Sequence, residues 1–143
     1  MRRKVQVWIY SHYENELWVL LLKLIPARGG FWQPVTGGVE GDENLAHAAS
    51  REAREETGFA AERLLDLKNS FRFEKKPGLI FEEHGFALAI SNSEGESLPE
   101  PKLDPKEHDA FQWVKAAQAS KMLEFQSNID MLQELFKTLL ISN

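Results

Sequence analysis

The segment from Gly37 to Phe59 constrains the fold of this chain more than any other. Read as a helix, its second half places Glu52, Glu55 and Glu56 on one face, because residues three and four apart are neighbours on a helix surface. Like charges at these spacings destabilise a helix by roughly 0.2–0.5 kcal/mol per pair. The helix dipole also disfavours anions in the last turns, and Arg51 can relieve one pair at most. The pattern therefore predicts that this helix binds a cation.

The chemistry of these side chains indicates which cation to expect. The ligands are carboxylate oxygens, the chain has no Cys, and no pair of His stands near the acids. Hard oxygen ligands favour magnesium or manganese over zinc. We therefore expect Mg²⁺ as the cofactor, with Mn²⁺ as the alternative.

The same segment resembles the Nudix box, G-x5-E-x7-R-E-U-x-E-E-x-G-U, in which U is a bulky apolar residue. Every charged and glycine position of that motif is matched, and the one departure is Ala53, which is small where the family has Leu, Ile or Val. Gly38 cannot be the first motif glycine, because it would place Asn44 at the acid position. The motif is filled by Gly37, Glu43, Arg51, Glu52, Ala53, Glu55, Glu56, Gly58 and Phe59.

Composition limits the other classes of function. A length of 143 residues without a long linker predicts one domain, 1–143. The net charge of −5 argues against a binder of nucleic acid polymers. There is no apolar run of about 18 residues and no signal-peptide pattern, so we expect no membrane partner. The lack of Cys is compatible with a reducing compartment, and we expect a cytoplasmic protein.

Hydrophobic patterning around the motif indicates a sheet flanked by helices. Before the motif we expect strands at 4–10 and 17–24, joined by a polar turn at 12–16. The apolar run of the second strand is continuous, which is typical of a central strand covered on both faces. The segment 31–36 leads into the motif glycines, which let the backbone approach a ligand.

The motif helix is expected to begin at Asp42 as N-cap and to end at Gly58. Its inner face would consist of small and apolar residues, and so could lie close to a sheet. This face is predicted from Leu45, Ala46, Ala49 and Ala53.

After the motif we expect strands at 65–71, 79–90 and 107–114, the turn 74–78, a flexible polar loop at 91–104 and a short helix at 116–122. A C-terminal helix over 128–140 would bury an apolar stripe. The order predicts an α/β fold with a mixed sheet between helical layers, and the resemblance implies the Nudix α/β/α sandwich. The stripe consists of Ile129, Met131, Leu132, Leu135, Phe136, Leu139 and Leu140.

The resemblance implies a reaction. Nudix enzymes hydrolyse nucleoside diphosphates linked to another group by attack of water on a pyrophosphate bond, and divalent cations neutralise the phosphates and activate the water. In the family's pattern Glu52 and Glu56 are metal ligands, while Glu55 is a ligand or helps to deprotonate the water. Arg51 would pair with Glu43, and both complete the candidate catalytic set as supports of the site.

The family also uses an additional acid from a later strand or loop. Our first choice is Glu83 and our second is Glu82, because one of these neighbours must project to the side of the motif helix. The alternative for either residue is an exposed acid at a strand edge. Glu107 is a third choice.

Other stretches resemble the Nudix branch that acts on dihydroneopterin triphosphate and on deoxynucleoside triphosphates such as dATP. The most specific is the Trp-Gln-x-Val-Thr-Gly run from Trp32 to Gly37, whereas Pro34 and Gly38 differ from the Ser residues of that branch. We predict that Trp32, Gln33, Gly37 and Gly38 bind substrate. An ordinary core role for Trp32 and a surface role for Gln33 are the alternatives, and His108, which follows Glu107, is a weaker candidate for the site.

The sequence thus predicts a metal-dependent hydrolase that releases pyrophosphate from a nucleoside triphosphate or from dihydroneopterin triphosphate. Two alternatives remain open. The substrate could be another nucleoside diphosphate derivative, such as ADP-ribose, a nucleotide sugar or a dinucleoside polyphosphate, or the chain could be a Nudix-fold module that senses a nucleotide without cutting it. We expect a small-molecule substrate and a monomer or homodimer.

Overall fold

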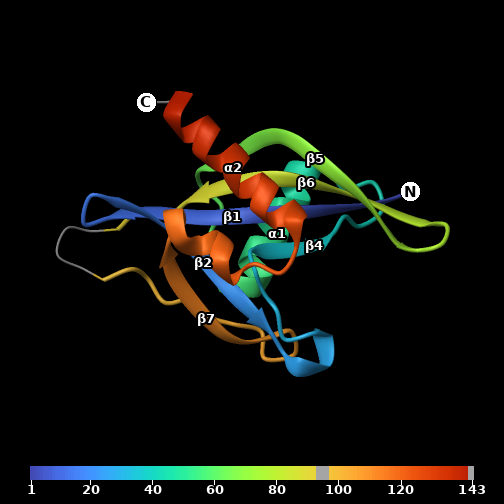
Figure 1. Cartoon of the computed structure of the whole chain (residues 1–143), viewed down its shortest axis with the longest axis horizontal. Helices are drawn as coiled ribbons and strands as arrows, with labels where there is room; N and C mark the ends of the chain where they lie inside the picture. The colour runs from blue at the N-terminus through green and yellow to red at the C-terminus, as the bar shows by residue number, and fades with distance from the viewer. Residues whose placement is uncertain (93–96, 142–143) are drawn as a thin grey trace.

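The computed structural model describes residues 1–92 and 97–141 (Figure 1). Within this part of the chain the strands form one seven-stranded sheet. The strands are β1 (Arg2–Tyr13), β2 (Glu16–Leu24), β3 (Trp32–Gln33), β4 (Val35–Gly38), β5 (Leu64–Lys76), β6 (Leu79–Ala89) and β7 (His108–Lys115). The helices are α1 (Leu45–Thr57) and α2 (Gln126–Ile141), with 3-10 segments η1 (Pro26–Arg28) and η2 (Ala116–Met122).

Strand β1 organises the sheet. It pairs with β6 in parallel along residues 2–10, and it pairs antiparallel with β4 through its first half and with β2 through its second half. Strand β2 continues the sheet to β3 and β7, and β5 pairs antiparallel with β6. The expected mixed sheet is therefore confirmed.

The two helices cover opposite faces of the sheet, as the expected α/β/α sandwich requires (Figure 1). Helix α1 packs Ala48, Ala49 and Ala53 against a core that includes the side chains of Val5 and Val7. Helix α2 packs Met131 and other apolar residues against the opposite core, which includes Trp8. Because side chains alternate along β1, this strand contributes residues to both cores. A Cβ at Gly85 would lie 2.1 Å from Met131 Sδ, so Gly85 lets α2 approach β6.

Several sequence expectations hold in detail. Residues 19–22 of β2 are at most 1% exposed, which confirms a strand covered on both faces. The helix η2 has the expected bounds. Gly58 ends α1 with φ 78°, and its N–H donates to the carbonyl of Arg54. No helix in the described ranges is long and apolar enough to cross a membrane.

Other expectations need correction. Helix α1 begins two residues later than expected, because the side chain of Asn44, not Asp42, accepts the N-cap hydrogen bond from His47 N. Ala46 is exposed in this register, and Ala48 takes its place in the core. Leu140 is 76% exposed and does not belong to the buried stripe of α2.

The hairpin regions also differ from expectation. The first hairpin turns at Glu14 and Asn15 alone, both at positive φ, so β1 and β2 are longer than predicted. Strand β5 runs on to Lys76, well beyond the predicted end at residue 71. Of the expected loop 91–104, residues 93–96 lie outside the described part.

Candidate active site

Gly37 of β4 lies directly against the side chain of Glu52 on helix α1. A Cβ built on Gly37 would lie 2.0 Å from the carboxyl carbon of Glu52, closer than real atoms approach. Gly38, by contrast, has open space where its Cβ would be. The missing side chain at Gly37 therefore makes the room that the Glu52 carboxylate occupies.

Arg51 connects the loop before α1 to the acids on the helix. Its Nε and Nη2 donate to the two carboxylate oxygens of Glu43, both at 2.9 Å, and Nη2 also donates to the carbonyl of Gly38 at 2.8 Å. Its Nη1 donates to Glu52 at 2.9 Å and to Glu55 at 3.3 Å. These hydrogen bonds lower the pKa of Glu43 to about 2 and raise that of Arg51. One guanidinium thus donates hydrogen bonds to three carboxylates, more than the single relieved pair expected from the sequence.

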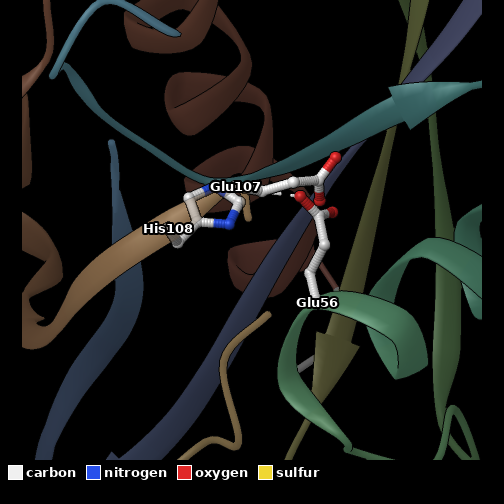
Figure 2. Close-up of side chains that lie close together, drawn as sticks. All are labelled: Glu56, Glu107 and His108. Atoms are coloured by element: carbon white, nitrogen blue, oxygen red, sulfur yellow. Dashed lines mark ion pairs between the residues drawn. The ribbon is translucent and has the colours of Figure 1, made fainter. Parts of the chain in front are cut away.

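Glu56 faces a second group of side chains, beyond the reach of Arg51's hydrogen bonds. Its carboxylate meets Glu107 and His108, and a ligand atom of each of the three lies within 4.8 Å of the others (Figure 2). Glu56 rises from α1, Glu107 precedes β7, and His108 begins it. Glu56 Oε1 and His108 Nε2 are 3.8 Å apart. The site therefore joins the motif helix to a strand that lies about fifty residues further along the chain.

Burial makes this group electrostatically unusual. Glu56 is 2% exposed, and its Oε2 has no hydrogen-bond partner among the described residues. Burial, reinforced by the charges of Glu52, Glu107 and Glu55, raises the pKa of Glu56 to about 10. His108 is 1% exposed, neither of its ring nitrogens is hydrogen-bonded to a described residue, and burial lowers its pKa. A buried acid and a neutral imidazole without partners are what a bound cation would complete.

The donor set fits a divalent cation. The carboxylates of Glu52, Glu55 and Glu107 all act on Glu56 electrostatically, and the buried Oε2 of Glu56 lacks a partner of its own. Oxygen donors of this kind suit magnesium and manganese. An acidic site that could hold a divalent metal is therefore present, and the exact set of ligands stays a prediction.

The structure separates Glu83 from this cluster. Adjacent residues on a strand point to opposite faces, and Glu83 is opposite Lys4 on the face that α2 covers, where its carboxylate accepts from Gln6 Nε2 at 2.9 Å. Glu82 is on the α1 side but pairs with Arg72 at 2.9 Å. The acid found beside Glu56 is Glu107, our third choice.

The predicted substrate residues also divide between two places. Gln33 lines a pocket on the α2 side and donates to Thr36 Oγ1 at 3.2 Å. Trp32 packs against the core beneath α2, which favours its structural role. Gly37 lies against the Glu52 carboxylate, and the carbonyl of Gly38 accepts from Arg51 Nη2.

Sequence reasoning gave little weight to His108. The spacing of His residues gave no signal, because the site depends on the pairing of β7 with β2, which places His108 opposite Leu24 on the α1 side. The local signal that could have found it is the Glu107-His108 pair at the start of a strand.

Comparison with known proteins agrees with this geometry. The family model of the NUDIX domain matches residues 2–135, so the chain belongs to the Nudix family, whose enzymes hydrolyse pyrophosphate bonds. Among its relatives, dihydroneopterin triphosphate diphosphatase of Escherichia coli K12 is 33% identical over 144 residues, covering 93% of this chain and 92% of that protein. The solved structure of the E. coli dihydroneopterin triphosphate pyrophosphohydrolase superposes with a TM-score of 0.77, at 27% identity and 92% coverage of both chains.

Two further proteins are similar to this chain, one over only part of its own length and the other at low sequence identity. An octanoyltransferase of Myxococcus xanthus is 38% identical over 129 residues, 87% of this chain, but the chain spans only 34% of that protein. The activity in its name therefore need not belong to the shared part. A NUDIX hydrolase structure from Listeria monocytogenes has a TM-score of 0.80 at 23% identity, covering 97% of this chain and 94% of that one, and supports the fold alone.

We predict that Gly37→Ala lowers divalent-metal affinity and activity by about 10²-fold, because its methyl group must displace the Glu52 carboxylate. Isothermal titration with Mn²⁺ and steady-state assays would measure both. Gly38→Ala, which meets open space, is the steric control and should keep the metal affinity of the parent. Equal metal affinity in both variants would contradict the proposed role of the contact.

We also predict a pH dependence of stability in protein freed of metal with a chelator. Native Glu56 keeps its proton up to about pH 10, whereas the unfolded chain loses it near 4.5, so the unfolded state binds fewer protons between these values. The free energy of unfolding should fall as pH rises through this range. Urea unfolding at pH 5 and pH 8 should show a smaller fall in Glu56→Gln than in the parent, and an identical fall would refute the assignment.

Proposed function

We propose that this Nudix enzyme releases pyrophosphate from a pterin or nucleoside triphosphate, with Mg²⁺ as its cofactor. The observation that carries the proposal is the buried Glu56, which has an oxygen without a hydrogen-bond partner among the described residues and lies beside Glu107 and His108. Such a site has little use without a cation and a polyanionic substrate. Similarity over nearly the full length of E. coli dihydroneopterin triphosphate diphosphatase supports the choice of substrate class.

In this proposal Glu52, Glu55, Glu56 and Glu107 hold the divalent cation. The cation, when bound, supplies charge neutralisation for the phosphates and lowers the pKa of water. His108 lies beside Glu56, where a nitrogen of its neutral ring can bind the metal or accept a proton. We assign the proton of the attacking water to Glu55, because its side chain is 57% exposed and so accessible to water.

The remaining site residues position these groups. Arg51 and Glu43 fix the loop before α1 against the helix, and the Arg51 hydrogen bond to Gly38 fixes the end of β4. The products of the reaction would be a monophosphate and pyrophosphate, formed as water attacks one phosphorus and the bridging oxygen leaves with the other phosphate.

The proposal is tested by a substrate panel. It contains dihydroneopterin triphosphate, the common nucleoside triphosphates, ADP-ribose, a nucleotide sugar and a dinucleoside tetraphosphate, each with Mg²⁺. Glu56→Gln should abolish turnover while circular dichroism shows an intact fold, and the exposed Glu62→Gln should retain parent activity. Turnover of ADP-ribose alone would overturn the substrate class, and an unchanged rate in Glu56→Gln would overturn the metal site.

A second prediction separates the two candidates for the additional acid. Glu107→Gln should weaken Mn²⁺ binding by about tenfold or more, because Glu107 lies beside Glu56. Glu83→Gln should leave Mn²⁺ affinity unchanged, because Glu83 is hydrogen-bonded to Gln6 on the other face of the sheet. The reverse result would restore Glu83 as the ligand.

A further inference from the structure

A pocket of about 550 Å³ opens on the face of the sheet that α2 covers. Its volume lies within the usual range for small-molecule sites. Lys4 of β1, Phe81 and Glu83 of β6 and Asn128 of α2 are among the residues that line it. The metal cluster does not use these residues, so the pocket needs an explanation of its own.

The polar side of the pocket has a fixed orientation. An indole N–H can only donate, so the 2.8 Å bond from Trp8 Nε1 identifies the acceptor oxygen of the Gln6 amide. The other end of that amide, Nε2, then donates to Glu83 Oε1 at 2.9 Å. Asn128 Nδ2 donates to the same Gln6 oxygen at 3.4 Å. Trp8 thus sets the direction of every bond in this network.

The network leaves acceptor capacity unused. Asn128 is 3% exposed, and its Oδ1 has no hydrogen-bond partner in the described ranges. Glu83 is 6% exposed, and a carboxylate can accept more bonds than the one from Gln6. A buried acceptor without a donor, such as Asn128 Oδ1, is unfavourable, so a ligand that brings N–H donors would be favoured here.

Aromatic rings form the other side of the pocket. The rings of Phe73 and Phe81 are stacked, with centroids 5.4 Å apart and an interplanar angle of 14°. Phe125 also lines the pocket, and Phe73 and Phe125 are 37% and 45% exposed. Exposed rings beside a polar patch suit a flat heterocycle with one hydrogen-bonding edge.

The pocket borders the acids of α1 across strand β4. Thr36 lines the pocket, whereas its neighbour Gly37 contacts Glu52 on the other face. A second hollow of about 380 Å³ shares Lys4 and Phe81 with the pocket and is lined by Arg2, Arg3 and Gly38. Positive charge therefore lies between the pocket and the motif glycines, where a phosphate chain would pass.

We propose that Glu83 and Asn128 select heterocycles with two adjacent N–H donors, a ring N–H next to an exocyclic amino group. This is the 2-amino-4-oxo edge that pterins and guanine share. Adenine offers an amino donor next to a ring acceptor, and hypoxanthine offers the ring N–H without the amino group. The inference rests on the proposed function and deepens it, because it names the part of the substrate that the enzyme reads.

The first test uses the unmodified enzyme with Mg²⁺ and compares pyrophosphate release from dihydroneopterin triphosphate, GTP, ITP and ATP. ITP differs from GTP by the amino group alone. We expect kcat/KM for GTP to exceed that for ITP by about tenfold or more, because bound ITP would leave a buried acceptor of the pocket without a donor. The ratio of kcat/KM for dihydroneopterin triphosphate to kcat/KM for GTP shows whether the enzyme prefers this edge on a pterin or on guanine. Equal rates for GTP, ITP and ATP would overturn the inference.

The second test changes the acceptor. Glu83→Gln can still accept from Gln6, but it would present an amide N–H toward the ligand's donors. The GTP to ITP ratio should fall to about one. The matched control is Glu82→Gln, the same change one residue away on the opposite face, where the partner is Arg72, and it should keep the parent ratio. Equal ratios in the parent and Glu83→Gln would also overturn the inference.

A binding measurement separates this inference from the proposed function. Neopterin fluorescence titrated with metal-free enzyme should report binding that weakens by about tenfold in Glu83→Gln and remains in Glu82→Gln. If neopterin binds in this way but no triphosphate is cleaved, the proposed function fails and the pocket assignment stands. If triphosphates are cleaved but the variants bind neopterin alike, the pocket assignment fails alone.

Discussion

The close packing of α1 on strand β4 is the constraint on which the rest of the site depends. The Glu52 carboxylate occupies the space beside Gly37, and the alanines on the inner face of α1 let the helix lie low on the sheet. This packing brings the acids of one helix face to the edge of the sheet. Arg51 then reaches Glu43, Glu52 and Gly38 together, which fixes the loop, the helix and the strand to one another.

The motif helix was predictable because its information is local. The spacing of Glu52, Glu55 and Glu56 and the terminal Gly58 determine a helix face and its end, and the structure shows both. The N-cap was placed two residues too early, because Asp42 and Asn44 are both good caps and only the loop geometry decides between them. The burial of β2 on both faces also followed from its continuous apolar run.

The second half of the site was not predictable in this way. Whether Glu82 or Glu83 faces α1 depends on the register of β6 against β1, and that register joins residues about eighty positions apart. The place of Glu107 and His108 depends on the pairing of β7 with the end of β2. The Glu107-His108 pair marks the start of a strand, but a single sequence does not show which strand it pairs with, so Glu107 could be named as a candidate but not selected.

The parallel pairing of β1 with β6 also has a kinetic consequence. Lys4 and Glu83 come together only when β1 pairs with β6, which lies far along the chain. Closing so long a loop costs conformational entropy before the contacts between the strands can form. The hairpins β1–β2 and β5–β6 can form early from neighbouring residues. We therefore expect the hydrogen bonds among Trp8, Gln6, Glu83 and Asn128 to form late in folding.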